Sequence, residues 1–255
     1  MKEAKIISIA NHKGGVGKTT TTVSLGAVLA QKGYKVLLVD LDGQANLTTS
    51  VLKGEPASSI YQSLCNTDVP LKKYRVHTKY VLDLAPACLE MTSADLVLGS
   101  KIARESILTN ILQSQKEEYD FILIDCPPSL GLLTINALVA SDYVIIPLIP
   151  EHLPMNGLQM ILKLFYEIKK NGLNSRISIL GILLTRWEHN KVHQLMSDNL
   201  QKEVGEMLFS TRIRKNITVA KAPQETTNIV EYDPKSNGAI DYVEFANEVL
   251  SKLNK

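Results

Sequence analysis

A short glycine-rich stretch near the amino terminus carries the residues best suited to phosphate chemistry. Residues 13–21 read KGGVGKTTT, after an apolar run at 5–10 and before helical apolar spacing over 18–32. Strand, glycine loop and helix hold phosphate because glycines let backbone N–H groups turn inward and a helix start adds unpaired donors. In this arrangement Lys18 places its charge on the outer phosphates, and the Thr19 hydroxyl ligates Mg²⁺. A plain strand–helix connection is the alternative, and the Gly-Lys-Thr spacing favours phosphate binding.

Three aspartates at predicted strand ends could complete a metal-dependent site. Asp40 and Asp42 lie at the end of the strand predicted at 35–40, and alternation along a strand puts them on the same side. Two close carboxylates repel unless a cation or a proton separates them, so the pair indicates phosphate-bound Mg²⁺ or, alternatively, two solvated turn residues. Asp125 follows the aliphatic run at 122–124, the pattern of a Walker B aspartate that holds Mg²⁺ directly or through water.

The elements that must position these residues alternate along the chain. Apolar runs predict strands at 5–10, 35–40, 80–85, 119–125, 143–148, 178–184 and 207–212, and helical spacing predicts helices near 18–32, 101–117, 130–140, 155–170 and 191–205. Near-continuous apolar strands are typical of a parallel sheet covered on both faces. The alternation predicts a single doubly wound, mostly parallel α/β sheet flanked by helices. Ligands of such sheets bind at the carboxyl ends of the strands, where the glycine loop and the aspartates fall.

Two further segments complete this outline. Residues 41–79 contain scattered Gly and Pro, which predicts loops and short helices there. A last helix is expected after Ser236, a suitable cap, over 237–254. Its apolar residues share one face, so we expect a helix packed on the core.

Composition sets the remaining bounds. A chain of 255 residues can form one large α/β domain, and a net charge of +2 gives no whole-chain argument for nucleic acid. The three cysteines are scattered without a CxxC pair, which fits a reducing compartment and provides no metal or disulfide framework. The first apolar run is too short for a signal peptide, and no run could span a bilayer. These features predict a cytoplasmic protein.

The glycine loop resembles the deviant Walker A loop of the ParA/MinD group of P-loop ATPases, in which an early lysine is the signature. Lys13 occupies that position, and His12 stands where the plain P-loop has glycine. The resemblance implies that Lys13 reaches across an ATP-dependent homodimer to the nucleotide of the other subunit. The loop residues then expected to bind ATP are Lys13, Gly14, Gly15, Val16, Gly17, Lys18, Thr19 and Thr20.

The aspartate segments share this resemblance. The end of the second strand is similar to the DxDPQ of the family, which implies that Asp42 positions the attacking water and that Asp40 lies near the metal shell. The expected catalytic residues are Lys13, Lys18 and Asp42, and the expected metal residues are Thr19, Asp40 and Asp125. Gly43 replaces the usual proline and Ala45 a common glycine, which favours a more mobile loop. IDCPPSLG, from Ile124 to Gly131, resembles the switch segment IDxPPxLG.

A late segment is locally basic. Residues 171–221 carry more Lys and Arg than Asp and Glu, which indicates either a phosphate-binding face or an ordinary solvated surface. IRKNITVAKAP at 213–223 resembles the ParA segment IPRNVRLSEAP, and a later stretch is close to the family's YDPKSxGA. The resemblance implies binding of DNA without sequence preference. The expected DNA-binding residues are Lys191, Arg214, Lys215 and Lys221, and Asn216 is expected at the nucleotide.

The resemblance therefore favours a ParA/Soj-type partition ATPase. Residues 1–255 would form a single deviant Walker A ATPase domain without an N-terminal helix-turn-helix domain. Its implied cofactors are ATP and Mg²⁺, and its implied partners are a second copy, nonspecific DNA on the nucleoid and a ParB-like centromere-binding protein. The alternatives are a MinD-like membrane-positioning ATPase and an ATP-switched factor that positions a protein cargo. The membrane alternative needs a basic amphipathic terminal helix, and 237–254 is acidic through most of its length.

Overall fold

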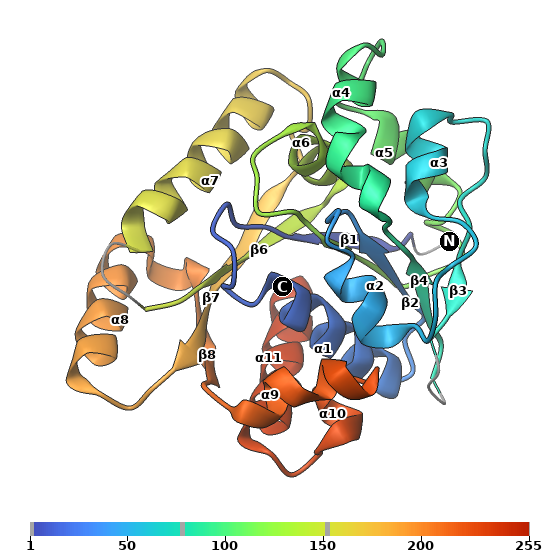
Figure 1. The fold of residues 1–255 in the computed structure, drawn as a ribbon. Coiled ribbons are helices and arrows are strands. Elements are labelled where there is room, and N and C mark those ends of the chain that lie inside the picture. Colours follow the sequence, from blue (N-terminus) through green and yellow to red (C-terminus); the bar gives the residue numbers. More distant parts are fainter. Residues whose placement is uncertain (1–2, 77–79, 151–153, 255) are drawn as a thin grey trace.

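A twisted sheet runs through the middle of the computed structural model, which describes residues 3–76, 80–150 and 154–254 (Figure 1). Within these ranges the sheet has eight strands. The strands are β1 (Lys5–Ile9), β2 (Val36–Asp40), β3 (Tyr74–Arg75), β4 (Leu82–Ala85), β5 (Phe121–Asp125), β6 (Tyr143–Leu148), β7 (Ser178–Trp187) and β8 (Leu208–Arg214).

Helices follow most strands and return the chain across the sheet. The α-helices are α1 (Lys18–Gln31), α2 (Asn46–Val51), α3 (Ile60–Cys65), α4 (Ala94–Gly99), α5 (Ile107–Gln113), α6 (Leu132–Ala140), α7 (Pro154–Lys170), α8 (Lys191–Val204), α9 (Ile217–Lys221), α10 (Ile229–Tyr232) and α11 (Asn237–Leu253). Short 3₁₀ turns are η1 (Leu89–Ser93), η2 (Gly205–Met207) and η3 (Ala222–Glu225).

The order of the strands brings the chemistry-bearing strand ends together. The order is β3-β4-β2-β5-β1-β6-β7-β8, and every neighbouring pair is parallel except β3 with β4. β5 lies between β2 and β1, so Asp125 is level with Asp40 on one side and Ile9 on the other. The predicted doubly wound, mostly parallel α/β fold is confirmed.

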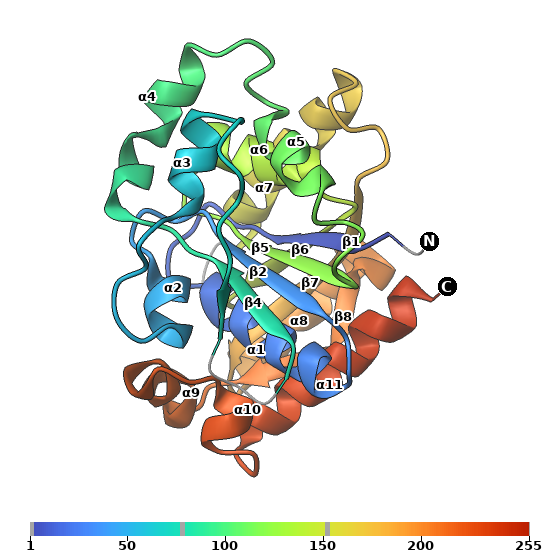
Figure 2. The ribbon, with the colours of Figure 1, turned by 90° about the vertical axis from the view of Figure 1, so that its right-hand side faces the viewer.

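Two apolar cores lie on opposite faces of the sheet, and strand residues alternate between them. Ile6 of β1 packs in the core under α3–α8, whereas its neighbour Ile7 packs in the core with α1 and α11. Figure 2 shows α3–α7 on one side of the sheet and α1, α10 and α11 on the other. This double covering explains why the strands are apolar at nearly every position.

The expected strands are confirmed to within about three residues at each end, with one addition. The two-residue strand β3 is antiparallel to β4 and lies in the segment expected to be loops and short helices. Residues 77–79 of that segment lie outside the described residues. α2 and α3 confirm the short helices.

The helix predicted at 101–117 is wrong over much of its length, because α5 covers only Ile107–Gln113. The buried Asn136 of α6 explains where α5 begins. Its Nδ2 donates to the Arg104 carbonyl at 2.8 Å, and its Oδ1 accepts from the Leu108 N–H at 3.0 Å. Ala103 has a φ of 51°, which interrupts a helical path before that point.

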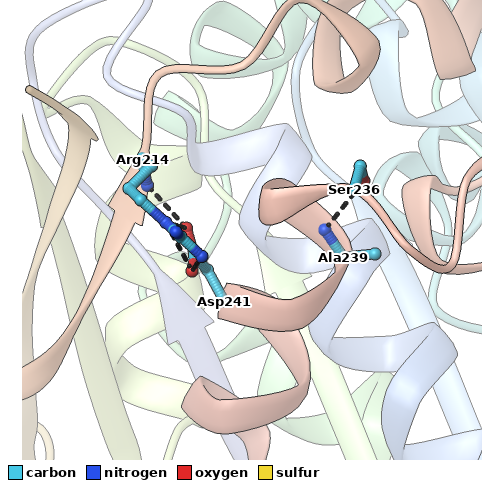
Figure 3. A network of polar contacts seen from close by, with 4 residues as sticks. All are labelled: Arg214, Ser236, Ala239 and Asp241. Carbon is cyan, nitrogen blue, oxygen red and sulfur yellow. Dashed lines mark hydrogen bonds and ion pairs between the residues drawn. The ribbon is translucent and has the colours of Figure 1, made fainter.

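α11 fulfils its predicted role as a packed helix, and it also covers an edge of the sheet. Ser236 caps it, because its Oγ accepts the Ala239 N–H at 3.2 Å (Figure 3). Its Tyr242 and Phe245 are fully buried. On the side facing the edge strand β8, Glu248 accepts the N–H groups of Ser210 and Thr211 at 2.8 and 2.9 Å.

Candidate nucleotide and metal site

The glycine loop connects β1 to α1 and is fastened to two neighbouring strands. Asn11 donates from Nδ2 to the Pro147 carbonyl of β6 at 2.7 Å, and its Oδ1 accepts the Lys13 N–H at 3.0 Å. Thr185 of β7 donates its hydroxyl to the Val16 carbonyl at 2.8 Å. Because these three contacts hold both ends of the loop, its backbone is already shaped before any ligand arrives.

Two glycines are required by the shape of this loop. Gly15 and Gly17 have φ values of 72° and 89°, in the left-handed region that side chains disfavour. Gly14 and Gly15 are exposed at the tip, where backbone N–H groups can approach a ligand. The exposed Lys13 opens the loop, as the early lysine of the sequence motif requires.

Lys18 begins α1, and its side chain lies inside the loop. It is buried, and its ammonium donates to the Lys13 carbonyl at 3.2 Å. Burial lowers the pKa of Lys18, and the negative charges of Asp125 and Asp42 oppose that shift. A buried ammonium inside a ring of backbone groups is suited to bind an anion, because it has already lost much of its water.

The structure brings together Thr19 and Asp125, two of the residues expected to hold the metal. The Thr19 hydroxyl donates to Asp125 Oδ2 at 2.7 Å. Asp125 is fully buried, and its Oδ1 has no hydrogen-bond partner among the described residues. Burial raises the pKa of Asp125 well above its usual range, and the charge of Asp40 raises it further. A buried carboxylate oxygen without a partner fits a cation ligand.

Asp40 lies beside Asp125, but its oxygens are engaged elsewhere. Its Oδ2 accepts the N–H and the hydroxyl of Thr48 at 2.9 and 2.7 Å, and its Oδ1 accepts the Asp42 N–H at 3.1 Å. Burial raises the pKa of Asp40 to about 6. Asp40 therefore holds the start of α2 and the loop that carries Asp42, a task that sequence reasoning did not assign to it.

Asp42 lies just beyond β2, half-buried, with Oδ1 accepting the Gln44 N–H at 3.0 Å. Its charge influences both Lys18 and Asp125, so the three groups share one electrostatic environment. Ala45, which stands where glycine is common in the resembling family, has a left-handed φ of 50°. An L-residue in that conformation costs about 1 kcal/mol.

A pocket adjoins the glycine loop on the side of α9 and α10. It is lined by Thr19 and Thr20 of α1 and by Val219, Pro223 and Asn228 from the late segment, among others. Asn216, the expected nucleotide contact, lies next to this region and caps α9 by accepting the Thr218 N–H at 2.8 Å. The late residues lining the pocket were missed by sequence reasoning, because nothing in their types indicates a shared surface.

The four basic residues predicted to bind DNA differ in their surroundings. Lys191 begins α8, Lys221 ends α9, and both are exposed. Lys215 is exposed and pairs with Glu188 at 2.7 Å. Arg214 is instead held by the buried Asp241 of α11, which accepts from its backbone N–H at 2.8 Å and from its guanidinium (Figure 3). The charge of Arg214 is therefore neutralised within the fold.

The buried carboxylate of Asp125 should lower the stability of the nucleotide-free protein by a measurable amount. We expect Asp125→Asn to raise the thermal midpoint of the nucleotide-free protein by a few degrees at about pH 8. A pKa raised in the folded state means that the ionised form opposes folding, so stability from this group is lost as pH rises through that pKa. The rise in the thermal midpoint caused by Asp125→Asn should therefore shrink as the pH falls from about 8 to about 5. The asparagine keeps an acceptor oxygen for the Thr19 hydroxyl.

The exposed Asp68 supplies a matched control, because Asp68→Asn removes the same charge from a solvated loop. Differential scanning calorimetry across the pH series measures both variants. A midpoint of Asp125→Asn that stays equal to the parent at every pH would contradict this account of the carboxylate.

Comparison with known proteins places these features in context. A family model described as an AAA domain matches residues 4–179. The sporulation initiation inhibitor protein Soj of Bacillus subtilis is 40% identical over 97% of this chain and 98% of its own length. The chromosome-partitioning ATPase Soj of Treponema pallidum is 36% identical over 97% and 98%. A cobyrinic acid a,c-diamide synthase structure from Mycobacterium smegmatis, with bound ADP and magnesium, has a TM-score of 0.85 at 31% identity over 99% and 96%.

No helix in the described part of the chain is both long enough and apolar enough to cross a membrane.

Proposed function

Because the chain belongs to the ParA/Soj family of P-loop ATPases, we propose that it is a DNA-partitioning ATPase whose ATP state is a dimer bound to nonspecific DNA. The chain is an ATPase that uses ATP and Mg²⁺. One observation carries the assignment of the site: Lys18, Thr19 and Asp125 meet at the fastened glycine loop, with a buried oxygen of Asp125 left for a cation.

The residues of the loop share the work of binding. The backbone from Gly14 to Thr20 surrounds the phosphates, Lys18 places a charge against their outer oxygens, and Thr19 with Asp125 holds the metal. Bound Mg²⁺ neutralises phosphate charge during transfer. Asp40 has an indirect role, because it fixes the loop of Asp42 by accepting the Asp42 N–H and by holding Thr48 of α2.

Two residues are assigned to turnover. Asp42 orients the attacking water, and its position is set by the turn that its own carboxylate makes with Gln44. Lys13 lies exposed at the mouth of the loop, which suits a side chain that reaches the nucleotide of a second copy. Phosphoryl transfer depends on positioning and charge neutralisation more than on covalent catalysis, so a carboxylate and an ammonium group are sufficient for these roles.

The DNA surface consists of three lysines: Lys191 begins α8, Lys215 follows the end of β8, and Lys221 ends α9. The ion pair of Lys215 with Glu188 is exposed and therefore weak, so it leaves the lysine available to phosphate. Arg214 supports this surface by anchoring the end of β8 to α11. A ParB-like protein would accelerate hydrolysis and release the dimer from the nucleoid.

Charge reversal tests the DNA surface directly. We expect Lys215→Glu with Lys221→Glu to weaken binding to unrelated DNA sequences alike in the presence of ATP. Each phosphate contact contributes about 0.9 to the slope of log affinity against log salt. A dimer presents each lysine twice, so the slope should flatten by up to about 3.6. Gel retardation over a salt series measures the slope, and a parallel titration measures ATP affinity, which should be unchanged.

The control is Lys32→Glu with Lys35→Glu, two exposed lysines between α1 and β2 at the opposite end of the strands. This control changes the net charge by the same amount. Lys215→Gln tests whether repulsion from Glu188 contributes to the effect. If the unaltered protein ignores DNA in its ATP state, partition is refuted, and a role in positioning a protein cargo or binding a membrane takes its place.

A further inference from the structure

One short segment touches both loops that adjoin the phosphate site. The segment is η1 with α4, Leu89–Gly99, and the loops are the one that carries Asp42 and the one between Asp125 and α6. These loops are far apart in sequence and have no helix in common. A segment that contacts both loops can therefore transmit a displacement of one loop to the other.

The first contact is between Gly43 and Thr92. A Cβ placed on Gly43 would lie 2.6 Å from Thr92 Cγ2 and 2.9 Å from the Thr92 backbone nitrogen. Both distances are shorter than side-chain packing allows, so the residue after Asp42 lies directly against η1 with no room between them. The absence of a side chain at position 43, where the resembling family has proline, is explained by this close approach.

The second contact is between Asp95 and the start of α6. α6 begins after Gly131, which has no side chain to cap the helix. Asp95 of α4 supplies the missing acceptor, because its Oδ1 accepts the Leu133 N–H at 3.1 Å. Its Oδ2 would lie only 2.0 Å from a Cβ on Gly131. The carboxylate thus caps a neighbouring helix and lies against Gly131, the residue that precedes it.

We propose that Leu89–Gly99 couples the two loops, with Thr92 and Asp95 as positioning residues for ATP turnover. Movement of the Asp42 loop displaces Thr92, α4 carries the displacement over a single turn, and Asp95 transmits it to the start of α6. The segment from Asp125 to α6 is held at its far end by this cap, so its path depends on α4. This inference rests on the proposed role of the Asp42 loop in turnover.

Removal of the cap should affect turnover more than binding. In Asp95→Ala we expect kcat to fall about five- to tenfold. This factor corresponds to the stabilisation that one helix cap provides, if all of it is lost from the transition state. The KM for ATP and the directly titrated ATP affinity should stay within about twofold. Asp95→Asn keeps an acceptor oxygen and should recover most of the lost rate.

A second variant distinguishes coupling from simple damage. Gly131 has φ −78° and ψ −170°, which alanine also adopts, so Gly131→Ala is restricted mainly by the Asp95 carboxylate. Gly131→Ala should push that carboxylate away and lower kcat as Asp95→Ala does. Because both changes break one contact, the double variant should be no worse than either single one.

Hydrogen exchange supplies a readout independent of turnover. In the unaltered protein, ATP should slow amide exchange at 41–47 and at 127–135 together. In Asp95→Ala, the protection at 41–47 should remain and that at 127–135 should be lost. Glu90→Ala is the matched control, because it removes an exposed carboxylate of the same segment whose side-chain hydrogen bond is to Cys88.

The outcomes separate the two proposals. An unaltered protein that binds no ATP refutes the proposed function itself. If the unaltered protein binds and hydrolyses ATP but Asp95→Ala leaves kcat and the exchange pattern unchanged, the coupling alone is overturned. Multiplied losses in the Asp95→Ala/Gly131→Ala double variant would likewise show that the two residues act separately.

Discussion

Lys18→Ala should lose about 100-fold or more of its affinity for ATP, close to 3 kcal/mol. The ammonium of Lys18 is buried inside the glycine loop and already donates to the Lys13 carbonyl, so the outer phosphates would find it in place. No other cation in the described site is buried there to replace it. Isothermal titration with ATP and Mg²⁺ measures the loss directly.

The fold should survive this change, because burial lowers the pKa of Lys18 and its charge is a cost to the nucleotide-free protein. Circular dichroism and the thermal midpoint verify that expectation. Lys35→Ala, on an exposed turn at the far end of the sheet, controls for the loss of one positive charge. Unchanged affinity in folded Lys18→Ala would refute the phosphate-loop assignment.

Asp42→Ala should separate binding from hydrolysis. We expect hydrolysis to fall by about 100-fold or more, because Asp42 is the residue proposed to orient the attacking water, while ATP affinity stays within a few-fold. With turnover blocked, the ATP dimer should persist. Sedimentation velocity with ATP should then show a lasting dimer where the unaltered protein returns to monomer as its ATP is consumed.

Asp68→Ala is the control, since it removes an exposed carboxylate from a loop away from the site. Asp40→Asn offers an informative contrast. It leaves Asp42 in place and weakens the bonds to Thr48 that fix its loop, so its loss of rate should be smaller. A parental rate of hydrolysis in Asp42→Ala would mean that another group positions the water.

Much of the fold and of the arrangement of the candidate phosphate site could be predicted because both depend on local pattern. Apolar runs mark strands that are buried on both faces, and a strand–glycine–helix order fixes where Lys18 and Thr19 lie. The meeting of Asp40 and Asp125 follows from parallel strands whose carboxyl ends share one edge. These inferences need only the period of a strand and the topology of the sheet.

The remaining features depend on contacts between distant residues, which no local pattern contains. Asn136 decides where α5 begins, and Asp95 caps a helix 38 residues later in the chain. Arg214 was predicted to face DNA from its charge and its place in a motif, yet its guanidinium is held by Asp241, 27 residues away. Side-chain type shows what a residue can bind, and only packing shows which partner it has.

The carboxylates of α11 have a consequence for behaviour at high concentration. β8 ends the order of strands, and an edge strand with unpaired N–H groups is a template on which another chain can add a strand. Glu248 occupies the N–H groups of Ser210 and Thr211, and Asp241 occupies that of Arg214. An incoming strand would find these donors taken and the negative charge of Glu248 beside them, so this rim of the molecule resists edge-to-edge aggregation.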